Sequence, residues 1–97
     1  MIEIKKKFTQ MINVSGRVQG VGFRYYTYNI ALQLGIKGWV KNMPDGSVRI
    51  IASGSVDNVY NLITYIKKGP PGARVESVAV TDYPETAEEF NNFTIRY

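Results

Sequence analysis

Apolar and polar residues alternate along the first part of the chain, and the period of the pattern then changes. The alternation over residues 8–18 has a period of two, which predicts a half-buried strand. Over residues 22–34 the apolar residues recur every three or four positions, which predicts an amphipathic helix that Gly35 is suited to end. The inward positions of this helix are expected to be Phe23, Tyr26 or Thr27, Ile30, Ala31 and Leu34.

Two further strands are predicted over residues 36–43 and 47–53, where alternation returns. Pro44, Asp45 and Gly46 separate them and favour a tight turn, because proline fixes φ, aspartate accepts local N–H groups and glycine adopts positive φ. A connection this short joins antiparallel neighbours, so the segment is predicted to be a β-hairpin.

The rest of the pattern predicts a second helix over residues 56–68, with Ser55 as its N-cap, and strands over residues 75–83 and 93–97. The element order is thus βαββαβ with one more strand at the end. Two helices separated by a hairpin pack on the same face of a sheet. The predicted fold class is α+β, a ferredoxin-like sandwich in which an antiparallel sheet carries both helices on one face.

A chain of 97 residues predicts a single domain with a modest core. Residues 1–7 have a weak pattern and three consecutive lysines, and are expected to form a mobile or loosely docked extension. The globular domain is then expected to span residues 8–97.

The residue inventory excludes several kinds of chemistry. There is no cysteine and no histidine, so disulfides, thiolate nucleophiles, the usual general base and the commonest metal ligand are all missing. No apolar run is long enough for a membrane span or a secretory signal, and a reducing cytoplasm is the expected location. The net charge of +4 favours small anions and by itself leaves nucleic acid open as a partner.

The most informative segment is GRVQGVGFR at residues 16–24, a glycine-rich loop that leads into the first helix. Glycine allows backbone N–H groups to converge, and a helix N-terminus adds free donors and a positive dipole end. Arg24 adds a planar fork of donors that suits phosphate oxygens. The spacing matches neither dinucleotide nor nucleotide phosphate loops, so the segment predicts either a structural turn or a nest for one phosphoryl group.

Asn42 is the second candidate for a functional role. By strand parity it shares the inward face with Gly38 and Val40, where an amide costs free energy unless it is hydrogen-bonded. It either bonds local backbone beside the turn or orients a ligand or a water molecule. Among the tyrosines, Tyr26 is expected in the core, while Tyr25 and Tyr28 either line the site or face solvent.

Two long motifs resemble one known family. GRVQGVGFR at residues 16–24 is similar to the acylphosphatase signature GxVQGVxFR, and GWVKNMPDGSVRIIASG at residues 38–54 resembles the second signature of that family. The resemblance covers about residues 10–97. It implies the ferredoxin-like fold already predicted from periodicity, and it implies hydrolysis of the carboxyl–phosphate bond of acyl phosphates.

The resemblance also implies the site. Arg24 is expected to bind the phosphate and Asn42 to position the attacking water. The backbone N–H groups of the loop are expected to complete the cradle, from residues Gln19, Gly20, Val21, Gly22 and Phe23. No metal or cofactor is implied. The expected partners are a small-molecule acyl phosphate and inorganic phosphate, without nucleic acid or membrane, and the expected state is a monomer.

Two alternatives stay open. The chain could be a non-catalytic, regulatory acylphosphatase-like domain, or an RNA-binding module, since RNA-recognition folds share the βαββαβ order. The segment 47–53 lacks the aromatic residues that such modules place on a central strand, which counts against RNA.

Overall fold

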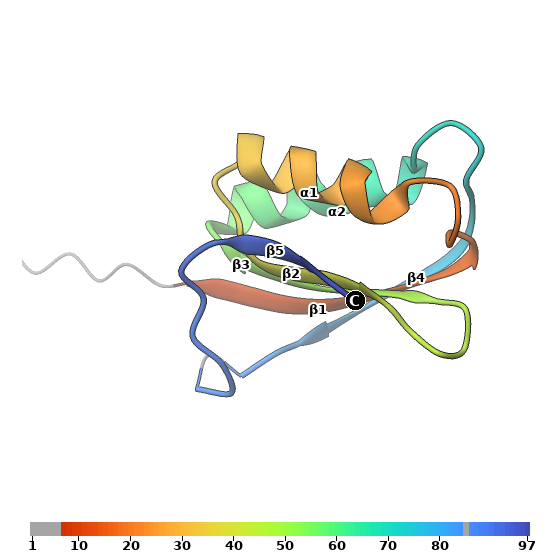
Figure 1. Cartoon of the computed structure of the whole chain (residues 1–97). Coiled ribbons are helices and arrows are strands. Elements are labelled where there is room, and N and C mark those ends of the chain that lie inside the picture. Colours follow the sequence, from red (N-terminus) through yellow and green to blue (C-terminus); the bar gives the residue numbers. More distant parts are fainter. Residues whose placement is uncertain (1–6, 85) are drawn as a thin grey trace, which may run out of the picture.

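The computed structural model describes residues 7–84 and 86–97, and these build a five-stranded sheet covered on one face by two helices (Figure 1). The strand order is β4-β1-β3-β2-β5. The elements in chain order are β1 (Phe8–Arg17), α1 (Phe23–Gln33), β2 (Lys37–Asn42), β3 (Val48–Gly54), α2 (Val56–Lys68), β4 (Arg74–Asp82) and β5 (Phe93–Arg96).

The predicted elements are confirmed, and no end differs by more than one residue. The prediction for α2 is confirmed at both ends because both signals are local. The Asn58 N–H donates to Ser55 Oγ at 3.2 Å, and Gly69 ends the helix with a φ of 72°. Gly35, with a φ of 66°, likewise follows the end of α1. Of the predicted extension, only Lys7 belongs to the described residues, and it is exposed.

The core lies between the helices and the sheet, and Thr27 rather than Tyr26 fills the inward position of α1. The Thr27 hydroxyl donates to the carbonyl oxygen of Phe23 at 3.0 Å, which satisfies the polar group within the core. Tyr26 is only half-buried, and its hydroxyl donates to the Tyr65 carbonyl oxygen at 2.8 Å. The expectation of a core Tyr26 is therefore wrong: it joins α1 to α2 instead.

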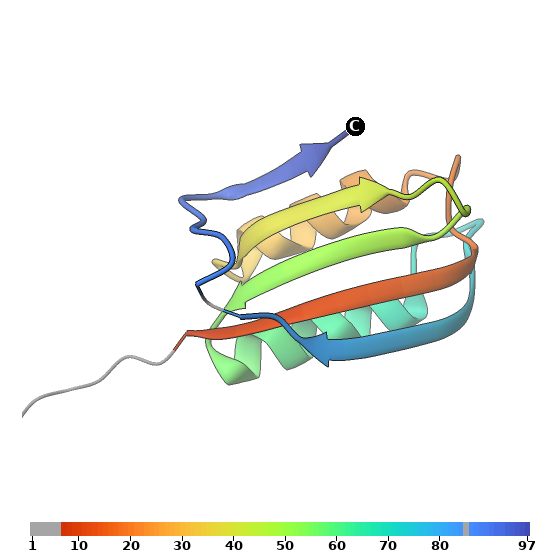
Figure 2. The same cartoon turned by 90° about the horizontal axis from the view of Figure 1, so that it is seen from below.

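The sheet differs from the expected antiparallel arrangement at one edge, because β5 runs parallel to β2. The other neighbouring pairs are antiparallel, so the sheet is mixed (Figure 2). The direction of β5 follows from the end of the sheet at which its connection from β4 begins. The chain leaves β4 beside the start of β1, where the Tyr83 N–H donates to the Thr9 carbonyl oxygen at 3.2 Å. It crosses to the far edge at that same end, where β2 also begins.

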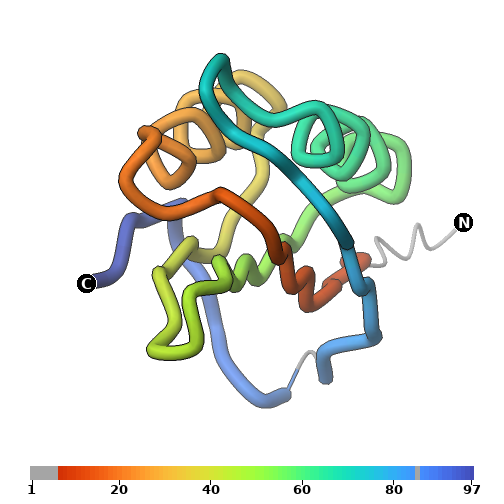
Figure 3. The backbone as a smooth tube through the Cα atoms, turned by 90° about the vertical axis from the view of Figure 1, so that its right-hand side faces the viewer, coloured from red at the N-terminus to blue at the C-terminus, as the bar shows by residue number. Residues whose placement is uncertain are grey.

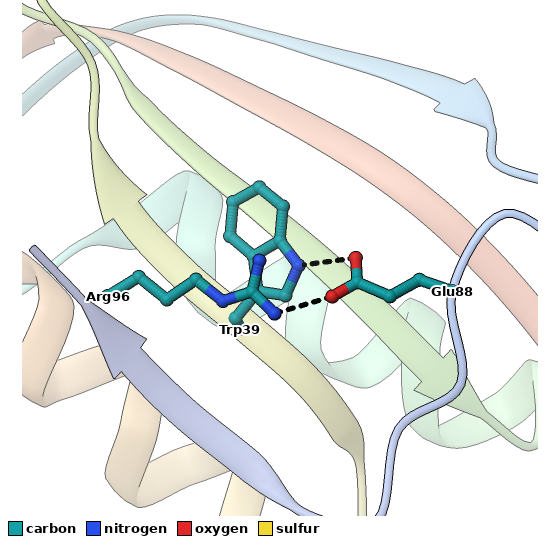
Figure 4. A network of polar contacts seen from close by, with 3 residues as sticks. All are labelled: Trp39, Glu88 and Arg96. Atoms are coloured by element: carbon teal, nitrogen blue, oxygen red, sulfur yellow. Dashed lines mark hydrogen bonds and ion pairs between the residues drawn. The ribbon is translucent and has the colours of Figure 1, made fainter.

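The connection between β4 and β5 is fastened to the open face of the sheet by Glu88 (Figure 4). Trp39 Nε1 donates to Glu88 Oε1 at 3.1 Å, and Arg96 Nη2 donates to Glu88 Oε2 at 2.5 Å. The Arg96 guanidinium also lies over the Trp39 ring, 4.7 Å from its centre. This network holds β5 to β2 from the side opposite the helices. No helix in residues 7–84 and 86–97 is both long enough and apolar enough to cross a membrane.

Candidate active site

A cleft of about 180 Å³ opens where the loop between β1 and α1 meets the ends of β2 and β5. Figure 3 faces this end of the molecule, where that loop and the turn between β2 and β3 come toward the viewer. The residues that line the cleft are Val18, Gly20, Gly22, Phe23, Arg24, Tyr25, Asn42, Ile95 and Tyr97. The structure thus brings together the glycine-rich loop, Arg24 and Asn42, which are far apart in the sequence.

Gly20 and Gly22 shape the loop by adopting left-handed φ values of 76° and 77°. A Cβ at either position would meet no atom within 4 Å, so the requirement for glycine is conformational rather than steric. Gly22 is the N-cap of α1 and offers no side-chain acceptor to the first turn. The N–H donors at the start of the helix therefore lack the capping oxygen that most helices supply.

Arg24 lies in the first turn of α1, where the helix dipole favours negative rather than positive charge. That turn contains no acidic residue. Among the described residues the one ion pair joins Arg96 to Glu88, so Arg24 has no carboxylate partner there. Its guanidinium lies over the Tyr97 ring, with Cζ 4.7 Å from the ring centre. An anion in the cleft would offset both the dipole and the unpaired charge.

Asn42 ends β2 on the face that carries the helices, as strand parity predicts. Its Oδ1 atom is buried and accepts no hydrogen bond from any described residue. An unpaired buried acceptor costs about 1–3 kcal/mol, so such groups are rare in folded proteins unless they serve a ligand or a water molecule. This oxygen thus takes no local backbone N–H of the described residues, as it would if Asn42 only capped the turn.

The side chains of two predicted loop residues lie away from the cleft, although the prediction concerns their backbone N–H groups. The Gln19 side chain points toward the hairpin, where Nε2 donates to the carbonyl oxygens of Met43 at 2.8 Å and Ser47 at 2.9 Å. Val21 is half-buried and packs against the core. Gly20, Gly22 and Phe23 are therefore the loop residues at the cleft, and Gln19 ties their loop to the turn that follows Asn42.

Sequence reasoning missed Val18, Ile95 and Tyr97 as lining residues. The alternation in the final strand does put Ile95 and Tyr97 on one face. The sequence gives no sign, however, of which sheet edge that strand joins. Tyr25, left open between site and solvent, is at the cleft.

The chemistry available at the cleft is that of charge and backbone donors. Within the described ranges, no three His, Cys, Asp or Glu side chains gather closely enough to hold a metal ion. A larger hollow of about 300 Å³ lies elsewhere and is lined by residues such as Thr9, Lys37 and Ser53, none of them from the glycine-rich loop. Fold and cleft together define a ferredoxin-like α+β protein with a cleft at its first β–α loop, lined by Arg24, Asn42 and two loop glycines.

Comparisons with known proteins agree with this class. The family model described as Acylphosphatase matches residues 10–95. An acylphosphatase of Pasteurella multocida is 45% identical over 94 residues, which cover 97% of this chain and 99% of that relative. The chain therefore belongs to the acylphosphatase family of enzymes.

Solved structures show the same relationship. The crystal structure of acylphosphatase from Bacillus subtilis superposes with a TM-score of 0.87 at 38% identity, covering 93% of this chain and 99% of that chain. Full-length HypF in its phosphate- and nucleotide-bound form contains a similar region, with a TM-score of 0.87 at 29% identity. That match covers 98% of this chain but only 12% of HypF.

Proposed function

We propose that the cleft hydrolyses the carboxyl–phosphate anhydride bond of acyl phosphates to a carboxylate and inorganic phosphate. Arg24 and the backbone N–H groups at Gly20, Gly22 and Phe23 hold the phosphoryl oxygens. Asn42 holds the attacking water through its Oδ1 atom. One observation carries the proposal: Asn42 and Arg24 line the same cleft, and neither the buried Asn42 Oδ1 atom nor the Arg24 charge has a partner among the described residues, in the form of a hydrogen-bond donor or a carboxylate respectively.

The reaction is an in-line displacement at phosphorus. The water oxygen bonds to phosphorus while the bond from phosphorus to the acyl oxygen breaks, and the electron pair of that bond leaves with the carboxylate. The protons of the water pass to the phosphate product. Phosphoryl transfer of this kind depends mainly on positioning and charge stabilisation, which Arg24 and Asn42 supply.

A chain without histidine or cysteine can catalyse this reaction because of the leaving group. A carboxylic acid has a pKa of about 4 on the Asp and Glu reference, so the carboxylate leaves at neutral pH without a general acid. The alkoxide from a phosphate monoester has no such advantage. The substrate class is therefore acyl phosphates rather than monoesters.

The alternatives have less support. An RNA-binding role would need aromatic rings exposed on the open face of the central strands. The open face of β1 and β3 carries none, and the nearby Trp39 is 9% exposed beneath Arg96. A purely regulatory role would not require the Asn42 acceptor. Arg24, Asn42 and the loop glycines meet in one cleft, so we propose that a single protomer forms the whole site.

The proposal is tested by following benzoyl phosphate hydrolysis through its ultraviolet absorbance, with phenyl phosphate as the matched monoester. The expected result is rapid hydrolysis of the anhydride, unaffected by EDTA, and little hydrolysis of the monoester. Equal rates on the two compounds, or no hydrolysis of benzoyl phosphate, would contradict it.

A further inference from the structure

The residues that line the cleft fall into two chemically different groups, a polar wall and an apolar wall. Gly20, Gly22, Arg24 and Asn42 supply the polar groups. The apolar wall consists of Tyr25, Ile95 and Tyr97, which are lining residues with apolar side chains that the core does not bury. The polar wall accounts for a phosphoryl group, and the proposed hydrolysis assigns no role to the apolar wall.

The two tyrosines of this wall are unusually exposed for large rings. Tyr25 is 64% exposed and Tyr97 is 91% exposed, so neither contributes much to the core. Exposed apolar groups that gather at a cleft mark a binding surface more often than isolated ones do.

The Tyr25 ring is nevertheless held in place. It stacks on Tyr28 with ring centres 6.2 Å apart and an interplanar angle of 22°. Tyr28 in turn lies against the buried Phe93, with ring centres 6.4 Å apart. This aromatic row anchors Tyr25 to β5 while leaving much of the ring uncovered. A ring fixed in advance loses little conformational entropy when it meets a ligand.

Tyr97 connects the two walls, because its ring covers one face of the Arg24 guanidinium at 4.7 Å. A guanidinium donates its hydrogen bonds in its own plane, so stacking on its face leaves those donors free for phosphate oxygens. A substrate bound through its phosphoryl group at Arg24 therefore has the Tyr97 ring beside the atoms that are attached to that phosphoryl group.

We propose that Tyr25, Ile95 and Tyr97 receive the acyl group, and that the enzyme consequently prefers acyl phosphates with aromatic or bulky apolar acyl groups. The inference rests on the proposed function. In an acyl phosphate the acyl carbon is one oxygen atom away from phosphorus, so a phosphoryl group on the polar wall brings the acyl group to the apolar wall. The ring of Tyr25, not its hydroxyl, supplies the contact.

The experiment compares kcat/KM for benzoyl phosphate with kcat/KM for acetyl phosphate, in the wild type and in three variants. In Tyr25→Ala the ratio of the two values should fall about 2- to 10-fold, the range expected for loss of one aromatic contact. In Tyr25→Phe the ratio should stay at the wild-type value. Tyr60→Ala removes a similarly exposed ring on α2 that does not line the cleft, and should also keep the ratio.

The outcomes separate this inference from the proposed function. If Tyr25→Ala keeps the wild-type ratio while both compounds are hydrolysed, the acyl contact is refuted and the proposed function stands. If Tyr60→Ala lowers the ratio as much as Tyr25→Ala does, the assignment to this wall is also refuted. If the wild type hydrolyses neither compound, the proposed function fails, and the inference fails with it.

Discussion

The side-chain amide of Gln19 lies 2.8 Å from the carbonyl oxygen of Met43, and this contact joins the loop at the cleft to the turn that follows Asn42. A second bond from the same nitrogen reaches the Ser47 carbonyl oxygen at 2.9 Å. The side chain thus spans both ends of the hairpin turn. This link holds the glycine-rich loop against the turn that follows Asn42, although Gln19 itself does not line the cleft.

Replacing Gln19 with alanine should lower both stability and turnover. Two hydrogen bonds are lost at about 0.5–1.5 kcal/mol each, so unfolding should become about 1–3 kcal/mol easier. A loop that shifts relative to Asn42 also loses productive geometry, and kcat should fall at least about 10-fold. Urea unfolding and benzoyl phosphate kinetics measure the two effects.

Gln10→Ala is the matched control for that variant. Gln10 Nε2 also makes two hydrogen bonds, to the Thr9 carbonyl oxygen and to Asp82 Oδ1, each at 2.9 Å. It lies outside the lining of the cleft. Its loss should cost similar stability but leave kcat within about 2-fold of the wild type, since no catalytic distance depends on it. Equal losses of kcat in both variants would refute the linking role of Gln19.

Asn42→Ala should reduce turnover without reducing stability. Loss of an oriented polar group that acts in the transition state costs about 10²–10³ in kcat. Because no described residue donates to the buried Oδ1 atom, its removal also relieves a cost, and the melting temperature should equal or exceed that of the wild type. Inhibition by inorganic phosphate should persist.

Asn58→Ala serves as the comparison for Asn42. The Asn58 side chain has a partner, since Nδ2 donates to the Leu34 carbonyl oxygen at 2.9 Å. Its loss should therefore lower the melting temperature, by about 4–8 °C for each kcal/mol of stability lost. If Asn42→Ala instead melts several degrees below the wild type and no longer responds to phosphate, Asn42 is a structural residue.

Local signals explain why so much of this fold could be predicted from the sequence. Ser55 and Gly69 mark the two ends of α2 through contacts with residues near them in the sequence. The change of period at residue 22 marks the start of α1. The edge that β5 joins could not be predicted, because it depends on where β4 ends and on the Glu88 network, both long-range. The need for glycine at position 38 is also long-range, because a Cβ there would lie 1.8 Å from the Ile51 carbonyl oxygen of the paired strand.

The candidate site also has features that the sequence could predict and features that depend on long-range contacts. Arg24, Asn42 and the glycines could be proposed from residue chemistry and motif resemblance, and they do line one cleft. The resemblance implies that the Gln19 backbone N–H belongs to the cradle, but it implies no role for the Gln19 side chain. Its role depends on the hairpin carbonyls that only the folded chain brings near. Tyr97 was missed for the same reason, since its neighbour Arg24 is far away in the sequence.

Acidification should weaken the Glu88 contacts that hold β5 beside β2. Hydrogen bonds from Arg96 and then from Trp39 lower the pKa of the Glu88 carboxyl below its ordinary value of 4.5. The folded pKa is below the unfolded one, so the stabilisation is present above the unfolded pKa and is lost as pH falls through the folded pKa. The Arg96 and Glu88 side chains are partly exposed, at 45% and 28%. Their ion pair should therefore contribute less than about 1 kcal/mol to the free energy of unfolding.

The measurement is the free energy of unfolding against pH for the wild type and Glu88→Gln. The variant should be less stable at neutral pH, and the difference should shrink as pH falls below the ordinary pKa. Glu89→Gln removes the same charge from the adjacent exposed residue and should follow the wild type. A constant difference between Glu88→Gln and wild type across the acid range would contradict the role assigned to the Glu88 carboxylate.

The most direct test of the account is benzoyl phosphate hydrolysis by the wild type, Arg24→Ala and Arg17→Ala measured side by side. Arg17 is an exposed arginine at the end of β1 that does not line the cleft, so its loss should leave kcat/KM within about 2-fold. Two hydrogen bonds to a charged group are worth about 3–6 kcal/mol, so Arg24→Ala should lose at least about 100-fold in kcat/KM, together with inhibition by phosphate. Hydrolysis by Arg24→Ala at the wild-type rate, with phosphate inhibition intact, would contradict the assignment of this cleft as the site of catalysis.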